Sequence, residues 1–209
     1  MLFALSVFSL GAFAARGLAQ QTPASSATSE SAGLPTVRDP DEYAVWSALL
    51  SAEVGNENTH ELIIVDHTIS TTKTPFTGLS WGMTTTGRRN PEVQPATRAD
   101  FDSKNKEMAV IVSQFDLKWP FALVSDEELR AVFGDDSKDQ AGWKRFYEKY
   151  PGALGVFAVS RVGFNAARDQ AMVYEIYKGG YLSGHGKFLV MSKRNGQWQL
   201  EKEILMWLS

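Results

Sequence analysis

Residues 178–186 come closest, in residue type and spacing, to supporting chemistry. Four glycines stand there with Ser183 and His185, and glycine allows positive φ and close backbone approach, as in anion- and ligand-binding loops. The spacing matches neither a nucleophile elbow nor a phosphate-binding loop. Ser183 and His185 would share one face of a strand but are poorly placed for proton transfer. We therefore expect a wide hairpin loop whose glycines serve its turns; the alternative is a ligand site at Tyr181, Ser183 and His185.

The imidazoles are the second set of candidates, because His60, His67 and His185 are the only histidines in the chain. Three histidines with a carboxylate could in principle bind zinc. Strand alternation places Asp66 on the side of His60, so we expect no Asp66–His67 pair. The spacing resembles no helix-borne ligand pair, and the chain has no cysteine to supply a thiolate or a disulfide. We therefore predict no metal site and no cofactor.

Several carboxylates invite a general-acid role, but they stand where helices are predicted to begin. Asp39, Asp41 and Glu42 open one predicted helix, and Glu127 and Glu128 open another. Acidic side chains at these positions accept hydrogen bonds from free backbone N–H groups and oppose the helix dipole. We therefore expect capping roles for them and predict no catalytic residue.

Two tryptophans stand outside the predicted core and are candidates for a contact surface. Trp81 lies in the long polar stretch 70–95, and Trp207 lies near the C-terminus. A loop as long as 70–95 is typical of a lid or partner-contact region, or of a poorly ordered insertion. We take both tryptophans as candidate binding residues, together with Tyr181, Ser183 and His185.

Composition limits the class of protein. The 209 residues are 44% hydrophobic, enough for one domain with a proper core. The formal net charge of −3 provides no basic face for a phosphate backbone, so nucleic acid is not an expected partner.

The N-terminus has the pattern of an export signal. An apolar run over residues 2–15 is followed by small residues before Gln20, which suits cleavage after Ala19, although no Lys or Arg precedes the run. The run is too short to span a bilayer. We predict a signal peptide at 1–19, a flexible linker at 20–37, a single domain at 38–209 and a periplasmic or secreted location. No stable membrane span is expected after signal removal. A buried N-terminal helix is the alternative.

Helices are predicted where capping residues precede apolar residues at helical spacing. Asp39 and Pro40 begin the first helix and Gly55 ends it. Ser125 with Glu128 forms a capping box. The further predicted elements are a helix at 140–150, a short helix at 97–106, and strands or extended segments at 61–67, 108–112 and 120–124.

The last quarter of the chain predicts four consecutive strands. Apolar runs at 155–162, 171–177, 186–191 and 198–208 are separated by short turns, which leave no room for crossover helices. Asn195-Gly196 is the strongest hairpin signal. Lys202 interrupts the alternation, which either a bulge or a lysine stem that covers apolar surface would accommodate. The predicted fold class is α+β, with an antiparallel sheet, a C-terminal four-strand meander and helices packed on one face.

These segments also carry a resemblance. Residues 160–165 (SRVGFN), 170–174 (QAMVY) and the final Trp207-Leu208-Ser209 resemble a widespread set of uncharacterised exported bacterial proteins over most of residues 39–209. The resemblance implies a single exported domain of bacterial origin and supplies no established activity. In those relatives the loop before the third meander strand is glycine-rich and sometimes holds cysteines, which are absent here.

We expect a non-enzymatic exported domain that binds a protein, a peptide or a small ligand, because no nucleophile, base and orienting group converge in the sequence. The alternative is a hydrolase or lyase with a site near His185.

Overall fold

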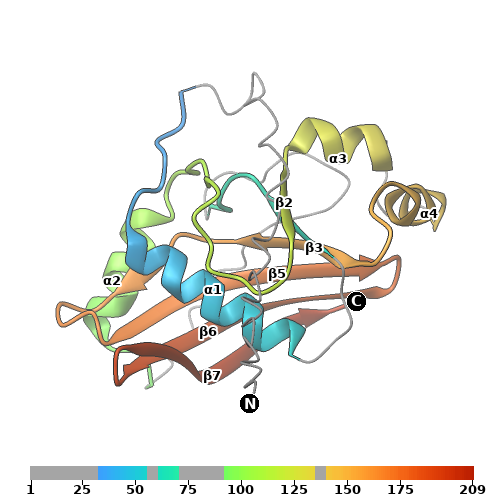
Figure 1. Cartoon of the computed structure of the whole chain (residues 1–209). Helices are drawn as coiled ribbons and strands as arrows, with labels where there is room; N and C mark the ends of the chain where they lie inside the picture. The colour runs from blue at the N-terminus through green and yellow to red at the C-terminus, as the bar shows by residue number, and fades with distance from the viewer. Residues whose placement is uncertain (1–32, 56–60, 71–91, 135–139) are drawn as a thin grey trace, which may run out of the picture.

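The computed structural model describes residues 33–55, 61–70, 92–134 and 140–209 (Figure 1). The expected signal peptide, most of the expected linker and Trp81 lie outside these residues. The fold is α+β, as predicted, and its elements follow in chain order: α1 (Pro40–Val54), β1 (Glu61–Val65), α2 (Pro95–Lys104), β2 (Phe121–Val124), α3 (Asp126–Phe133), α4 (Gln140–Lys149), β3 (Ala153–Val159), β4 (Gly163–Phe164), β5 (Gln170–Gly180), β6 (Ser183–Arg194) and β7 (Gln197–Leu208).

Helix α1 begins and ends where the sequence predicts. The Asp39 side chain accepts a hydrogen bond from the Asp41 backbone N–H, Pro40 occupies the first turn, and Gly55 ends the helix at φ 57°. The capping box of Ser125 and Glu128 begins α3, also as predicted. Just before α1, Val37 is buried and its N–H donates to the Val110 carbonyl. None of the described helices is both long and apolar enough to cross a membrane.

The sheet is mostly antiparallel, in the order β2-β1-β3-β5-β6-β7 with β4 beside β5. Strands β3, β5, β6 and β7 are antiparallel neighbours, which confirms the predicted meander. Strand β1 instead runs parallel to both β2 and β3. Helices α3 and α4 connect β2 to β3 as a crossover, so β2 and β3 run in the same direction on either side of β1. The expected strand at 108–112 is reduced to isolated bridges at Val110.

Helices lie on both faces of the sheet, whereas we expected them on one face. Alternate residues of β3 enter different cores: Phe157 and Val159 pack with α1, while Val156 and Ala158 pack with residues of α2, α3 and α4. Figure 1 shows α1 running across the front of the sheet. Because the inner strands are apolar on both sides, each face needs its own covering layer.

The glycine-rich segment is a tight hairpin and not a wide loop. Strands β5 and β6 are joined at Tyr181 and Leu182, and Gly179, Gly180, Gly184 and Gly186 belong to the strands. None of these four glycines has positive φ. Close packing requires three of them instead: a Cβ at Gly186, for example, would overlap Trp207 and the Tyr174 hydroxyl, whereas Gly180 has room for one.

The last hairpin has the predicted turn, with Asn195 at φ 51° and Gly196 at φ 80°. The register of β7 against β6 shifts between Val190–Lys202 and Met191–Leu200, so a bulge accommodates Lys202 as predicted.

The packing at Gly186 gives a direct test of this hairpin. We expect Gly186→Ala to lower the free energy of unfolding by about 1–3 kcal/mol, because the added methyl group meets two aromatic side chains held in the core. Denaturant unfolding measures the change.

Gly180→Ala is the matched control, since its Cβ would meet only Ser183 at 3.5 Å. We expect this variant to remain within about 0.5 kcal/mol of the unmodified protein. Equal losses in the two variants would contradict the packing role of Gly186.

Candidate functional site

A cluster of charged side chains lies on the α1 face of the sheet, where the helix ends above β5 and β6. We call Glu53, Glu175, His185 and Lys187 the His185 centre. Glu175 pairs directly across the strands with Lys187, and Tyr177 pairs with His185, so these side chains share one face. Glu53 is supplied by the last turn of α1.

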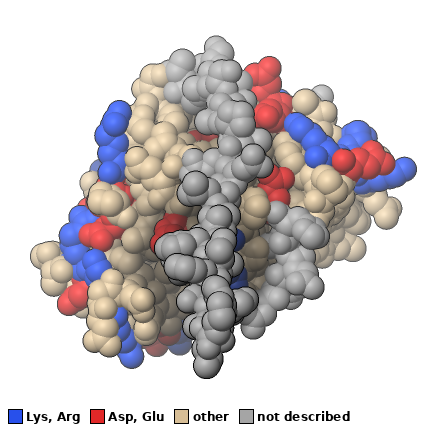
Figure 2. Space-filling view, viewed as in Figure 1, with Lys and Arg blue, Asp and Glu red and all other residues tan. Residues whose placement is uncertain are grey.

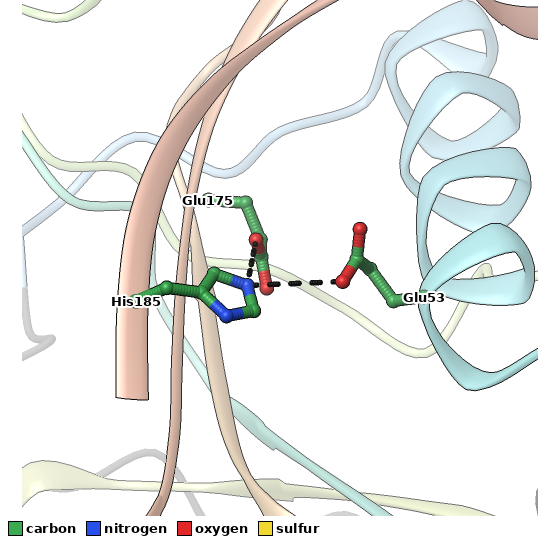
Figure 3. Close-up of side chains that lie close together, drawn as sticks. All are labelled: Glu53, Glu175 and His185. Carbon is green, nitrogen blue, oxygen red and sulfur yellow. Dashed lines mark hydrogen bonds and ion pairs between the residues drawn. The ribbon is translucent and has the colours of Figure 1, made fainter. Parts of the chain in front are cut away.

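Glu53, Glu175 and His185 lie close together (Figure 3), and Lys187 joins them through Glu53. His185 Nε2 lies 3.2 Å from Glu175 Oε2 and 3.7 Å from Glu53 Oε2. Lys187 Nζ lies 2.5 Å from Glu53 Oε1 and 3.4 Å from Glu203 Oε1. In Figure 3 the Glu175 carboxylate points toward the space between the imidazole and Glu53.

Glu175 differs from the other members of the centre in its burial and in its hydrogen bonding. Its side chain is fully buried, and within the described part of the chain its Oε1 has no hydrogen-bond partner. Burial raises the pKa of Glu175, the nearby charge of Glu53 adds to the rise, and the hydrogen bond and charge of His185 oppose it. A buried carboxylate with a raised pKa beside an imidazole is typical of functional sites.

Lys187 behaves differently, although it is also buried. Burial by itself would lower its pKa, but the hydrogen bond to Glu53 and the charges of Glu53, Glu175 and Glu203 outweigh burial and raise it. Lys187 is therefore a fixed cation that holds one oxygen of Glu53.

Chemically, the centre can exchange a proton between His185 and Glu175, or it can bind a cation with oxygen and nitrogen donors. Proton exchange would use Glu175 Oε2, whereas a bound cation could also use Oε1, which has no hydrogen-bond partner in the described fold. The adjacent strands β5 and β6 and the last turn of α1 position these donors.

Of the four sequence-predicted site residues that the structure describes, only one belongs to this centre. His185 belongs to it, whereas Tyr181 and Ser183 are exposed near the hairpin turn. Trp207 lies on the opposite face, where its Nε1–H donates to the Tyr174 hydroxyl at 3.0 Å. Trp81 lies outside the described residues.

Two further expectations are corrected. Asp66 and His67 do pair, with Nδ1 and Oδ1 2.9 Å apart; β1 ends at Val65, so strand alternation does not govern them. Glu42 does not complete a capping box. It is fully buried, Arg161 donates to its carboxylate at 2.6–3.2 Å, and the Val162 N–H donates to it at 2.9 Å.

The residues that carry the resemblance take structural roles in the described fold. Arg161 pairs with Glu42, and Asn165 Oδ1 accepts hydrogen bonds from the backbone N–H groups of Asp169 and Gln170. Gln170 Oε1 in turn accepts from the Thr97 hydroxyl. The segment 160–170 therefore holds α1 and α2 to the sheet.

Comparison with known proteins gives no relative from which a function could be transferred. No protein-family model matches the chain, and neither a curated protein nor a solved structure matches it significantly.

Glu42 offers a test of how much a buried carboxylate with all its hydrogen bonds contributes to the free energy of unfolding. We expect Glu42→Gln to lower the free energy of unfolding by roughly 2–4 kcal/mol, because Arg161 loses its ionised partner while remaining largely buried. Chemical denaturation measures this loss. A change within about 0.5 kcal/mol would show that the pair contributes little to folding.

The raised pKa of Glu175 makes stability depend on pH. Above pH 4.5, the ordinary pKa, the unfolded chain releases a proton that the folded protein retains. The contribution of Glu175 to the free energy of unfolding is therefore most favourable below pH 4.5. It is lost as the pH rises through the raised pKa of the folded protein. We expect the Tm difference between Glu175→Gln and the unmodified protein to be smallest at or below pH 4.5 and to grow toward neutral pH. A constant difference would contradict the raised pKa.

Proposed function

We propose that this chain is an exported bacterial binding domain without enzymatic activity of its own, and that it binds a small positively charged ligand at the His185 centre. The observation that carries the proposal is the fully buried Glu175, whose Oε1 has no hydrogen-bond partner among the described residues. Leaving a buried carboxylate oxygen unsatisfied costs stability, so a ligand that donates to it or neutralises it is the natural complement.

The charge of the centre supports a positively charged ligand. When Glu53, Glu175 and Glu203 are ionised and His185 is neutral, three negative charges face the single positive charge of Lys187, which leaves a net charge of −2. Lys187 already forms ion pairs with Glu53 and Glu203. The remaining negative charge therefore centres on Glu175.

A purely structural ion network is the competing interpretation, and Glu42 shows what such a network looks like in this fold. Glu42 is as buried as Glu175, but its two oxygens accept hydrogen bonds from Arg161 and the Val162 backbone. The contrast between a satisfied and an unsatisfied carboxylate supports a ligand role for Glu175.

Export and bacterial origin are supported by the N-terminal pattern of residues 1–19 and by the resemblance of most of residues 39–209 to exported bacterial proteins. Nucleic acid remains an unexpected ligand. In the view of Figure 2, the described acidic and basic side chains are interspersed, which does not favour binding to a phosphate backbone.

A second candidate function is acid–base catalysis of the lyase type, favoured by the 3.2 Å contact between His185 Nε2 and Glu175 Oε2. Hydrolysis through Ser183 has less support, because Ser183 is exposed at the hairpin end and His185 makes its described side-chain contacts with carboxylates. Turnover of ester, peptide or phosphate substrates that disappears in His185→Ala would favour catalysis over binding.

Stability separates a functional carboxylate from a structural one. At neutral pH we expect Glu175→Gln to raise the free energy of unfolding by about 1–2 kcal/mol, or Tm by roughly 2–6 °C, because the neutral amide removes a buried and unsatisfied charge. Thermal unfolding followed by circular dichroism measures the shift.

Glu42→Gln is the matched control, since it makes the same substitution at an equally buried glutamate. We expect the two variants to shift Tm in opposite directions. A loss of stability in Glu175→Gln as large as that in Glu42→Gln would mean that the His185 centre serves folding, and the proposed function would fail.

A further inference from the structure

We infer that the ligand of the His185 centre is a divalent transition-metal ion of the zinc type, held by Glu53 Oε2, the Glu175 carboxylate and His185 Nε2. This inference rests on the proposed function and names its ligand. The three donors come from positions 53, 175 and 185, so no local sequence motif connects them.

The spacing of the donor atoms fits a small ion. One ligand atom from each of Glu53, Glu175 and His185 lies within 4.8 Å of the other two. The imidazole nitrogen is 3.2 Å from one carboxylate and 3.7 Å from the other. Tetrahedral zinc with bonds of about 2.0–2.1 Å separates its ligand atoms by roughly 3.3 Å. Only small side-chain movements are therefore needed to enclose the ion.

The donor types select the class of metal. Magnesium and calcium prefer sites made of oxygen ligands alone, whereas one imidazole with two carboxylates suits zinc, cobalt and related ions. A set of three protein ligands also leaves a coordination position for water or a further ligand, which is typical of catalytic zinc sites and not of closed structural ones.

Lys187 and Glu203 form the surroundings of the site. Lys187 binds Glu53 Oε1, and this contact directs Glu53 Oε2 toward His185. Outer contacts of this kind orient metal-binding carboxylates. The net charge of −2 for the ionised glutamates and Lys187 equals the charge that a divalent ion neutralises. Lys187 therefore acts as a positioning residue that limits the excess negative charge.

The backbone that carries the donors is well supported. Glu175 and His185 lie on the central paired strands β5 and β6, and Glu53 lies on a helix packed over them. Buried apolar side chains of α1 and the sheet fix these elements before any ion binds. Rigid elements of this kind hold donor atoms more precisely than a loop does.

Zinc binding by the full chain tests the inference directly. The protein is stripped with a chelator and titrated with Zn²⁺ by calorimetry, and Co²⁺ absorption reports the coordination geometry. We expect one ion per chain with micromolar affinity, weakened as pH is lowered because protons compete for the donors. We expect His185→Gln and Glu175→Gln each to weaken binding at least about tenfold.

Glu148→Gln is the matched control, because Glu148 is an exposed glutamate of α4 that pairs with Lys144 and has no contact with the His185 centre. We expect the zinc affinity of this variant to stay within about threefold of that of the unmodified protein, since Glu148 is neither a proposed ligand nor an outer contact of one. Binding that survives His185→Gln would place the metal elsewhere in the chain, for example at His60 or His67, and would overturn the assignment.

The outcomes also separate the two proposals. Absence of zinc and cobalt binding, with Glu175→Gln still more stable than the unmodified protein, would overturn the metal assignment and leave the binding centre standing. Absence of metal binding together with destabilisation by Glu175→Gln would overturn both.

Discussion

The docking of α1 onto the sheet is the interaction on which the rest of the structure depends. Its apolar middle, including the fully buried Trp46, Leu49 and Leu50, packs against one face of the sheet. Glu42 and Glu53 are eleven residues apart, which is close to three helical turns, so both carboxylates face the sheet from the same side of the helix. Arg161 binds the first and Lys187 binds the second. Any shift of α1 along the sheet would break both ion pairs, and the position of Glu53 over His185 is fixed in this way.

The two ends of α1 nevertheless have different chemistry. At the N-terminal end, every oxygen of the buried carboxylate has a donor, and the network ends in the backbone N–H of Val162. At the C-terminal end, the helix carboxylate is satisfied by Lys187, but the strand carboxylate of Glu175 is not fully satisfied. Folding alone would favour an apolar residue or a glutamine at position 175. A charged side chain at that position is therefore better explained by a ligand than by packing.

Local signals in the sequence predicted most of the fold, because they depend on neighbouring residues. Asp39-Pro40 and Gly55 bounded α1, Ser125 and Glu128 began α3, and Asn195-Gly196 formed the last turn. The parallel pairing of β1 depends on how distant elements pack, and alternation along a five-residue strand does not reveal it. The site was harder to predict from the sequence than the fold. Of its four members only His185 was singled out, although a glutamate within the apolar run at 171–177 was a visible signal for Glu175.

The glycine-rich segment carries one member of the His185 centre, but its glycines do not have the role that we expected. Its glycines were expected to shape a loop, but they lie in extended strands, where neighbouring atoms leave no room for a Cβ at Gly179, Gly184 or Gly186. Gly184 and Gly186 flank His185, and side chains on the far face fill the space beside Gly186: Trp207 and Tyr174, joined by a hydrogen bond. The strand that carries His185 is thus held from behind by aromatic packing while its other face presents the imidazole to Glu175 and Glu53. Trp207 thus supports, from the opposite face of the sheet, the strand that carries His185.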